Sequence, residues 1–260
     1  MRTISGSRAA KFGSSEDVPV PADYDNDGLV DVAVFRQTTG EWFMRGWSYT
    51  GFAHLTWGNP ALGDVPLPAD YDGDGIVDLA VYRRTTGEWL IQRSADYTLS
   101  RFSWGNPRLD DVPVPADYDG DGRTDLAVYR RSTGEWFIHR SADEGTTYVG
   151  GSGPSRDATP VVADYDGDRK ADLAVFSRTT GQWRIVLSSD GAVVTRSWGA
   201  PALGDVPVPL DYDGDGRADL TVYRRTTGQW FIRHSATGLA DTPIWGDPAK
   251  GDIPAFGFLR

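Results

Sequence analysis

Hydrophobic and polar positions follow a pattern that returns every 47 residues along this chain. In residues 111–158, a polar loop (117–125) precedes an apolar run (126–130), and a Ser-Thr-Gly turn leads to the aromatic-rich run 135–140. Short apolar runs bounded by turn residues predict β-strands, and no segment carries a convincing helical period. A first strand near 111–116 and a last strand that usually ends in Trp-Gly complete the repeat. Each repeat therefore predicts about four short strands.

The prolines indicate where the first strand lies. Pro113 and Pro115 stand two residues apart, so the N–H groups that they lack face the same edge of the strand. That edge cannot pair with another strand. The second strand, 126–130, is apolar on both faces and needs cover from both sides. A radial stack of four-stranded sheets meets both conditions, because its innermost strands have a free edge at the central channel. Equivalent prolines are Pro19 and Pro21, Pro66 and Pro68, Pro207 and Pro209, with Pro160 alone in the fourth repeat.

The pattern predicts an all-β fold: a single β-propeller domain over residues 1–260, most simply with five blades of four antiparallel strands. The repeats lie near residues 17–63, 64–110, 111–157, 158–204 and 205–251. The segments near 7–13 and 252–257 resemble a last and a first strand. Since the fifth repeat has its own last strand, predicted at 242–245, one end strand is surplus. Part of a larger six- or seven-bladed ring is the alternative.

A tryptophan recurs after each Thr-Gly turn. We expect these side chains to fill the faces between blades, because each blade needs a large wedge there. The set is Trp42, Trp89, Trp136, Trp183 and Trp230.

The polar loop of each repeat is a nine-residue run with Asp at positions 1, 3, 5 and 9. Four carboxylates this close repel one another, and a hard divalent cation removes that cost. Calcium takes 6–8 oxygen ligands, and a Gly at position 6 permits the sharp turn. We therefore predict about one Ca²⁺ per repeat. The predicted ligands are Asp23, Asp25, Asp27, Asp31, Asp70, Asp72, Asp74, Asp78, Asp117, Asp119, Asp121, Asp125, Asp164, Asp166, Asp168, Asp172, Asp211, Asp213, Asp215 and Asp219.

An EF-hand and a metal-free turn share parts of this pattern. An EF-hand needs a bidentate Glu at position 12, where this chain has valine in every repeat, so it is excluded. Asp and Gly also favour hydrated turns without any metal. Recurrence of all four carboxylates in five repeats favours calcium over turns alone.

Two loops depart from the pattern. Arg169 stands at position 6 of the fourth loop, where the others have Gly. A non-Gly residue at positive φ is strained and its cation adds repulsion, so we expect the loop 164–172 to hold the weakest site. Asn26, at position 4 of the first loop, fits a turn conformation well.

Composition and charge narrow the possible partners. The formal net charge is −11, and five calcium ions would leave about −1, so most of the acidity belongs to the loops. Nucleic acid is disfavoured as a partner, because the chain has no basic tract. No apolar run approaches the length of a membrane span. The chain has no cysteine, and residues 1–7 lack the apolar segment of a signal peptide. We expect a fragment of a longer exported protein.

Catalytic groups do not converge in the sequence. His54, His139 and His234 stand at unrelated points of the repeat, and the loop carboxylates are committed to metal. The expectation is no enzymatic activity. Aromatic side chains outside the repeat pattern are better candidates for ligand contact: Trp47, Tyr49, Phe52, Tyr97 and Tyr148.

The repeat resembles the FG-GAP or VCBS-type repeat of integrin α-subunit propellers and bacterial surface proteins. The resemblance rests on Trp-Gly or Phe-Gly (Phe12-Gly13) followed by Asp-x-Asp-x-Asp-Gly-x-x-Asp-Leu-Ala-Val, and covers about residues 7–257. It implies a calcium-bearing propeller outside the cell or on its surface that binds an extracellular glycan or protein. Where many members have Gly-Ala-Pro after the second strand, this chain has Tyr82-Arg83-Arg84, so an integrin-like ligand surface is not expected.

The favoured function is a calcium-stabilised binding or adhesion module. The alternatives are a lectin with glycan pockets between blades or on outer loops, and a non-catalytic scaffold of a larger secreted enzyme. A polysaccharide lyase would need a non-repeated acid–base pair in one cleft, and the sequence contains none that we can identify.

Overall fold

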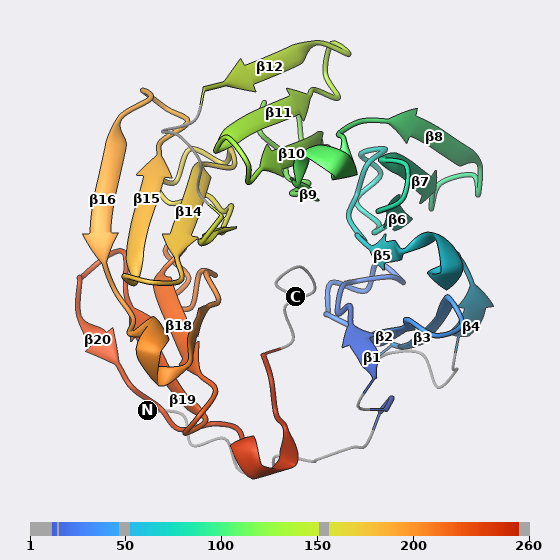
Figure 1. The fold of residues 1–260 in the computed structure, drawn as a ribbon. Coiled ribbons are helices and arrows are strands. Elements are labelled where there is room, and N and C mark those ends of the chain that lie inside the picture. Colours follow the sequence, from blue (N-terminus) through green and yellow to red (C-terminus); the bar gives the residue numbers. More distant parts are fainter. Residues whose placement is uncertain (1–11, 15, 47–52, 151–155, 255–260) are drawn as a thin grey trace.

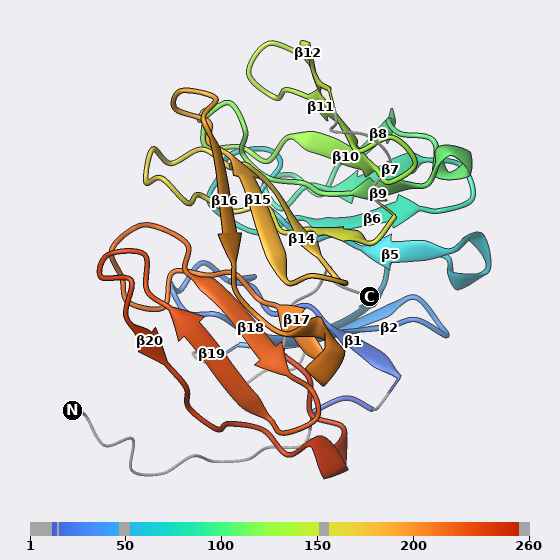
Figure 2. The same cartoon turned by 60° about the vertical axis from the view of Figure 1, so that its left-hand side comes forward.

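A computed structural model describes residues 12–14, 16–46, 53–150 and 156–254, and shows a ring of five four-stranded antiparallel sheets (Figure 1). Each sheet is built from one repeat, and its strands follow one another in sequence order from the channel outward. Blades that are consecutive in the chain lie side by side in both views (Figures 1 and 2). The predicted five-bladed propeller is confirmed.

The strands occupy four radial positions. The innermost are β1 (Asp17–Pro19), β5 (Asp64–Pro66), β9 (Asp111–Pro113), β13 (Ala158–Pro160) and β17 (Asp205–Pro207). The second are β2 (Val32–Arg36), β6 (Leu79–Arg83), β10 (Leu126–Arg130), β14 (Leu173–Ser177) and β18 (Leu220–Arg224). The third are β3 (Glu41–Arg45), β7 (Glu88–Gln92), β11 (Glu135–His139), β15 (Gln182–Val186) and β19 (Gln229–Arg233). The outermost are β4 (Ala53–Thr56), β8 (Leu99–Ser103), β12 (Thr146–Val149), β16 (Val193–Ser197) and β20 (Ala240–Asp241).

The remaining regular elements of the described chain are short 3₁₀ helices. Three precede the inner strands of blades 2, 3 and 5: η1 (Pro60–Leu62), η2 (Pro107–Leu109) and η3 (Pro201–Leu203). The fourth, η4 (Pro248–Lys250), follows the last strand. None of the helices in the part of the chain described here is long and apolar enough to cross a membrane.

The proline-containing strands are edge strands, as predicted. Each pairs with only one neighbour in its sheet; β5, for example, pairs with β6 through Pro66 opposite Val81. The second strands are buried on both faces: Ala80, Val81 and Tyr82 of β6 are inaccessible to solvent. A free edge at the channel and double-sided cover therefore coexist in one blade.

The Trp-Gly step sets the distance between blades. Gly105 has φ 95°, and a Cβ placed there would lie 2.8 Å from Val128 Cγ1 of the next blade. Gly199 and Val222 have the same relation at 2.9 Å. Only glycine lets adjacent sheets approach this closely.

The recurring tryptophans are core residues, as predicted. Trp42, Trp89 and Trp183 are fully buried and Trp136 is 4% exposed, whereas Trp230 of the last blade is half-buried. Trp89 Nε1 donates to the carbonyl of Trp104, 2.9 Å away. Trp42, Trp183 and Trp230 make the same bond, so in four blades the tryptophan joins the third strand to the Trp-Gly step and its one polar atom is satisfied.

A buried ion pair locks the inner strand to the second strand. Asp111 lies directly opposite Arg130 in the β9–β10 register, and the guanidinium donates to both of its carboxylate oxygens at 2.7 and 2.9 Å. Asp111 also accepts the Asn106 N–H at 2.7 Å. Arg130 stacks over the Phe137 ring at 4.2 Å. Blades 1, 2 and 5 repeat the pair as Asp17–Arg36, Asp64–Arg83 and Asp205–Arg224.

Blade 4 has neither residue of this ion pair. Ala158 stands opposite Ser177 in the β13–β14 register, at the places of the aspartate and the arginine. A buried charge left alone costs several kcal/mol, whereas removal of a whole pair can be nearly neutral. Relative to the other four blades, blade 4 therefore carries a natural double substitution of the ion pair.

We expect Arg130→Ser to destabilise the protein by about 3 kcal/mol, because it leaves the Asp111 carboxylate buried without its cation. The double variant Asp111→Ala/Arg130→Ser, which copies blade 4, should be more stable than Arg130→Ser alone. Urea unfolding at constant calcium measures both, with Arg101→Ser on the exposed face of β8 as control. If the loss of stability in the double variant equalled the sum of the losses in Asp111→Ala and Arg130→Ser, the two residues would not act as a pair.

The ends of the ring differ from the predicted strands. Residues 12–13 and 252–254, the described parts of the predicted end strands 7–13 and 252–257, are not in strands. The last strand of the fifth blade is β20 (Ala240–Asp241) with an isolated bridge at Ile244, so the predicted strand at 242–245 is wrong. Pro243 lies between the two and has no N–H for the ladder, which accounts for the interruption.

Candidate metal centres

The acidic loops connect the first and second strands at one end of the ring. In blade 2 the loop winds around Asp70, whose carboxylate accepts the N–H groups of Gly73 at 2.6 Å and Gly75 at 2.9 Å. Both glycines have positive φ, 84° and 86°, as a turn this tight requires. The corresponding first aspartates of blades 3, 4 and 5, with the same two bonds, are Asp117, Asp164 and Asp211.

The aspartate at position 9 is the buried member of each loop. Asp78 is fully buried and accepts the N–H groups of Tyr71 at 2.9 Å and Ser94 at 2.7 Å. Burial raises the pKa of Asp78, and the neighbouring Asp72 carboxylate raises that pKa further. The raised pKa therefore reflects first the burial of the carboxylate and only secondarily the like charge beside it.

A tyrosine at position 2 anchors the loop to the inner strand. Tyr71 O–H donates to the Leu67 carbonyl at 2.9 Å. Burial raises the pKa of Tyr71 well above its ordinary value, so the phenol keeps its proton and remains a donor. Matching tyrosines are Tyr24, Tyr118, Tyr165 and Tyr212.

Carboxylate oxygens converge in four of the loops. One oxygen from each of Asp70, Asp72 and Asp78 lies within 4.8 Å of the others. The corresponding groups are Asp117, Asp119 and Asp125 in blade 3, Asp164, Asp166 and Asp172 in blade 4, and Asp23, Asp25 and Asp27 in blade 1.

Two of these oxygens fit a bound cation in particular. Asp23 Oδ1 and Asp72 Oδ2 are buried and have no hydrogen-bond partner among the described residues. Buried oxygens are rarely left in this state, and hard anionic oxygens are the ligands that calcium prefers. The donor set therefore fits calcium.

The carboxylates at position 5 contact a residue that the sequence prediction missed. Ser94, which follows the third strand, donates through Oγ to Asp74 Oδ2 at 3.0 Å. The same contact joins Ser141 to Asp121, Ser188 to Asp168 and Ser235 to Asp215. These serines recur at steps of 47 residues, so the repeat itself contained the signal.

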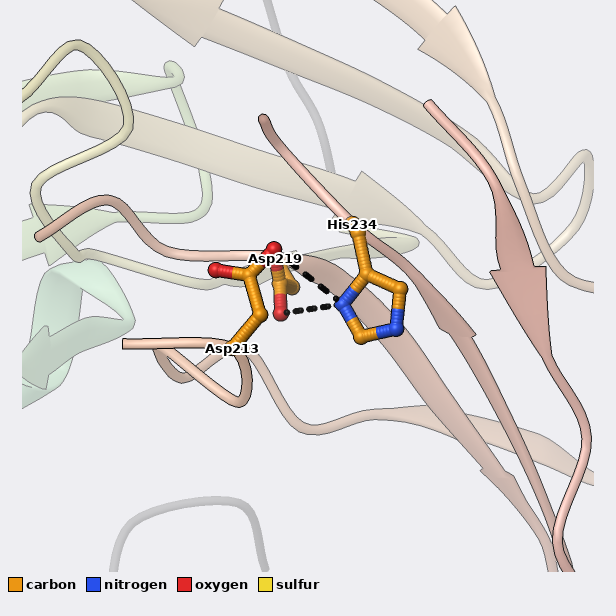
Figure 3. Close-up of side chains that lie close together, drawn as sticks. All are labelled: Asp213, Asp219 and His234. Carbon is orange, nitrogen blue, oxygen red and sulfur yellow. Dashed lines mark hydrogen bonds and ion pairs between the residues drawn. The ribbon is translucent and has the colours of Figure 1, made fainter. Parts of the chain in front are cut away.

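The fifth loop contains a nitrogen donor as well. His234 Nδ1 lies 3.4 Å from Asp213 Oδ2 and 3.3 Å from Asp219 Oδ2 (Figure 3). Its Nε2 lies 3.0 Å from Asp241 Oδ2. Mixed nitrogen and oxygen donors suit transition metals better than calcium. The fifth loop is thus chemically distinct from the other four, a difference that its aspartates alone do not reveal.

Neighbouring loops are joined through their backbones. The Asp70 carbonyl accepts the Thr124 N–H of the next loop at 2.8 Å. The same bond links Asp117 to Ala171 at 2.7 Å and Asp164 to Ala218 at 2.6 Å. Each carbonyl belongs to a position-1 aspartate, so these bonds link consecutive loops directly.

Position 6 of the fourth loop is strained, as predicted. Arg169 has φ 69°, and its N–H donates to Asp164 at 2.7 Å as a glycine N–H does in blades 2, 3 and 5. Asn26 of the first loop also has a positive φ, 58°, which asparagine tolerates.

We expect Arg169→Gly to stabilise the protein by about 1 kcal/mol, or a few degrees in melting temperature. The strain exists with or without metal, so this gain in stability should persist in EDTA. A larger gain in calcium than in EDTA would measure the effect of removing the positive charge from the metal site. Gly122→Ala is the matched control, because a Cβ at Gly122 has nothing within 4 Å and only strain is added. Equal melting temperatures for wild type and Arg169→Gly would contradict this account.

The aromatic ligand candidates lie apart from the loops and in different blades. Tyr97, in the β7–β8 hairpin, is 78% exposed, and Tyr148 on β12 is 55% exposed. The Tyr148 ring packs on Phe137 at 5.3 Å and its hydroxyl donates to Glu135. Trp47, Tyr49 and Phe52 lie outside the described residues.

Comparison of the fold with solved structures places the chain among β-propellers. Virginiamycin B lyase from Staphylococcus aureus is 9% identical, with a TM-score of 0.59 over 92% of this chain and 74% of that one. A streptogramin B lyase is 10% identical, with a TM-score of 0.59 over 90% and 72%. A lectin from Agrocybe aegerita is 17% identical, with a TM-score of 0.58 over 88% and 66%. At these identities the likeness is one of fold alone.

Within that class, the repeats themselves have a family. The profile of the FG-GAP-like repeat matches residues 70–128 and 117–175. Blades 2 to 4 thus contain FG-GAP-like repeats, as the resemblance predicted. No curated protein matches the sequence significantly. The chain is a β-propeller with FG-GAP-like repeats, a binding or scaffold module.

Proposed function

We propose that the chain is a calcium-stabilised binding module that acts outside the cell or on its surface, without catalysis of its own. The observation that carries the proposal is the convergence of three carboxylate oxygens within 4.8 Å in each of four loops. The unpartnered buried oxygens of Asp23 and Asp72 support it. A divalent ion would supply the positive charge that these groups lack.

The residues of the chain hold the loop in shape for that ion. Asp70, Asp72 and Asp78 would be its ligands in blade 2, with the equivalent aspartates in blades 3 and 4. Tyr71 ties the loop to the inner strand, and Ser94 orients Asp74 from the third strand. These outer contacts fix the carboxylates before the ion arrives, which lowers the entropy that binding loses.

The proposed location follows from the number and design of the sites. Several similar sites, each built from a short surface loop, are useful where calcium is millimolar, as it is outside the cell. The partner would be an extracellular glycan or protein that several similar blades contact together.

We expect EDTA to lower the melting temperature by more than about 10 °C, since each site occupied at 100 times its dissociation constant adds about 2.7 kcal/mol. Differential scanning calorimetry with calcium and with EDTA measures the shift. Asp121→Ala should lose more of this calcium-dependent stabilisation than Asp168→Ala, because the loop that contains Asp168 also contains the strained Arg169. An unchanged melting temperature in EDTA would refute calcium stabilisation.

A specific cavity favours glycan binding as a second candidate function. A cavity of about 750 Å³ lies between blades 1 and 2, and Trp57, Leu79 and Tyr97 are among its lining residues. Trp57 Nε1 is buried without a hydrogen-bond partner among the described residues. At two other blade junctions the equivalent N–H is used: Trp104 donates to Phe137 and Trp198 to Phe231.

An open junction with an aromatic wall suits a sugar ring. The Agrocybe aegerita lectin, whose fold is similar, recognises non-reducing terminal N-acetylglucosamine. That ligand is the first to test, followed by a broad glycan array.

We expect Tyr97→Ala to weaken glycan binding about tenfold through the loss of ring stacking. Tyr148→Ala is the matched control, since this exposed tyrosine packs on its own blade. Isothermal titration with the glycan found on the array gives both affinities. No binding across the array, or equal losses in both variants, would count against a pocket at this junction.

A further inference from the structure

A ring of arginines lines the end of the channel opposite the acidic loops. The residue after each second strand is Gln37, Arg84, Arg131, Arg178 and Arg225 in blades 1 to 5, at steps of 47 residues. All five line one cavity of about 670 Å³. Because the second strand runs from the acidic loop to this residue, the two groups of charges stand at opposite ends of the blades.

Most acidic groups near this cavity are already neutralised. Asp111 and Asp205 line it, but Arg130 and Arg224 hold both of their oxygens in the ion pairs of the inner strands. Asp110 is the remaining carboxylate among the lining residues. The four arginines thus leave an excess of about three positive charges in a protein whose net charge is −11.

The guanidinium groups of Arg131 and Arg178 differ in their contacts with the protein. Arg131 Nε is buried and has no hydrogen-bond partner among the described residues. Burial lowers the pKa of Arg131, and the neighbouring cations Arg178 and Arg84 lower that pKa further, although Asp110 opposes them. Arg178 is held in position, since its Nε and Nη2 donate to the Asp157 and Arg156 carbonyls.

Below the arginines the cavity wall is apolar. Val65, Val112 and Val206, the middle residues of inner strands, line it. A volume of this size matches a small-molecule site, and guanidinium groups bind carboxylate, sulfate or phosphate through paired N–H donors. The wall suits the apolar face of a sugar ring.

We propose that the arginine end of the channel binds a compact polyanion, a sugar or similar small molecule that carries at least two carboxylate, sulfate or phosphate groups. Several oxyanion groups are needed because four cations from four blades converge on one volume. The site is separate from the acidic loops, and its occupation does not depend on whether those loops bind calcium.

Isothermal titration at low ionic strength and constant calcium tests the proposal. The probes are a trisulfated heparin disaccharide, glucose 1,6-bisphosphate and digalacturonate, which distinguish the three anion types, with maltose as the neutral control. We expect saturable binding of at least one anionic probe at one site per chain, and none of maltose. No binding of any anionic probe would overturn the proposal.

Variants that exchange the residues found at this position in different blades locate the site. Arg131→Gln introduces the residue that blade 1 has at this position and should weaken binding about tenfold. Gln37→Arg completes the ring and should strengthen binding. Arg196→Gln, on the exposed outer strand β16, is the matched control and should leave the affinity unchanged.

The outcomes are separable from those of the calcium experiment. If Arg131→Gln fails to fold, Gln37→Arg alone decides, because a gain in affinity cannot come from unfolding. Equal losses in Arg131→Gln and Arg196→Gln would mean non-specific attraction and would also overturn the proposal. Loss of stability in EDTA with intact anion binding in calcium would leave both proposals standing.

Discussion

Crowding of like charges is the constraint on which the rest of this structure depends. Four of the loops each place three acidic side chains within a few ångströms, and burial of the position-9 aspartate makes the repulsion between carboxylates stronger. The chain offsets part of this cost with backbone N–H donors, as Asp70 and Asp78 show. The surrounding contacts, from the Tyr71 anchor to the serine of the third strand, hold the groups in place despite their repulsion.

The opposite end of each blade solves a related problem differently. There the inner-strand aspartate meets an arginine of the same sheet, and the two charges cancel internally. Blade 4 shows that this pair is a unit, since Ala158 and Ser177 replace it together. Because the inner-strand aspartate pairs with the first arginine of each Arg-Arg step, such as Arg130, it is not available to the second, such as Arg131. Two adjacent arginines thus have different environments, one inside the sheet and one at the channel.

Much of the fold could be predicted because the relevant physics is local and repeated. The missing N–H groups of Pro113 and Pro115 defined the edge strand, and the step of 47 residues defined the blade. The positive φ of Arg169 could be predicted because one glycine position in five had changed. The interrupted strand β20 was missed, because the pattern placed the strand at 242–245, where Pro243 breaks the pairing.

The site was predicted less completely, for a physical reason. The aspartates are adjacent in sequence, whereas Ser94 reaches Asp74 across 20 residues and His234 reaches Asp219 across 15. Such contacts depend on the register between the second and third strands. Similarly, the hydrogen bond from Thr124 to Asp70 joins two blades, and no pattern within one repeat could indicate it.

Separation of charge along the blades gives the molecule a direction. Carboxylates gather at one mouth of the ring and guanidinium groups at the other, so the metal-free chain has an electric dipole along the channel, which cations bound in the acidic loops would reduce. Near an anionic surface, the electric field would exert a torque on this dipole. That torque would turn the arginine mouth toward the surface. The propeller would approach with the same face each time, before any specific contact forms.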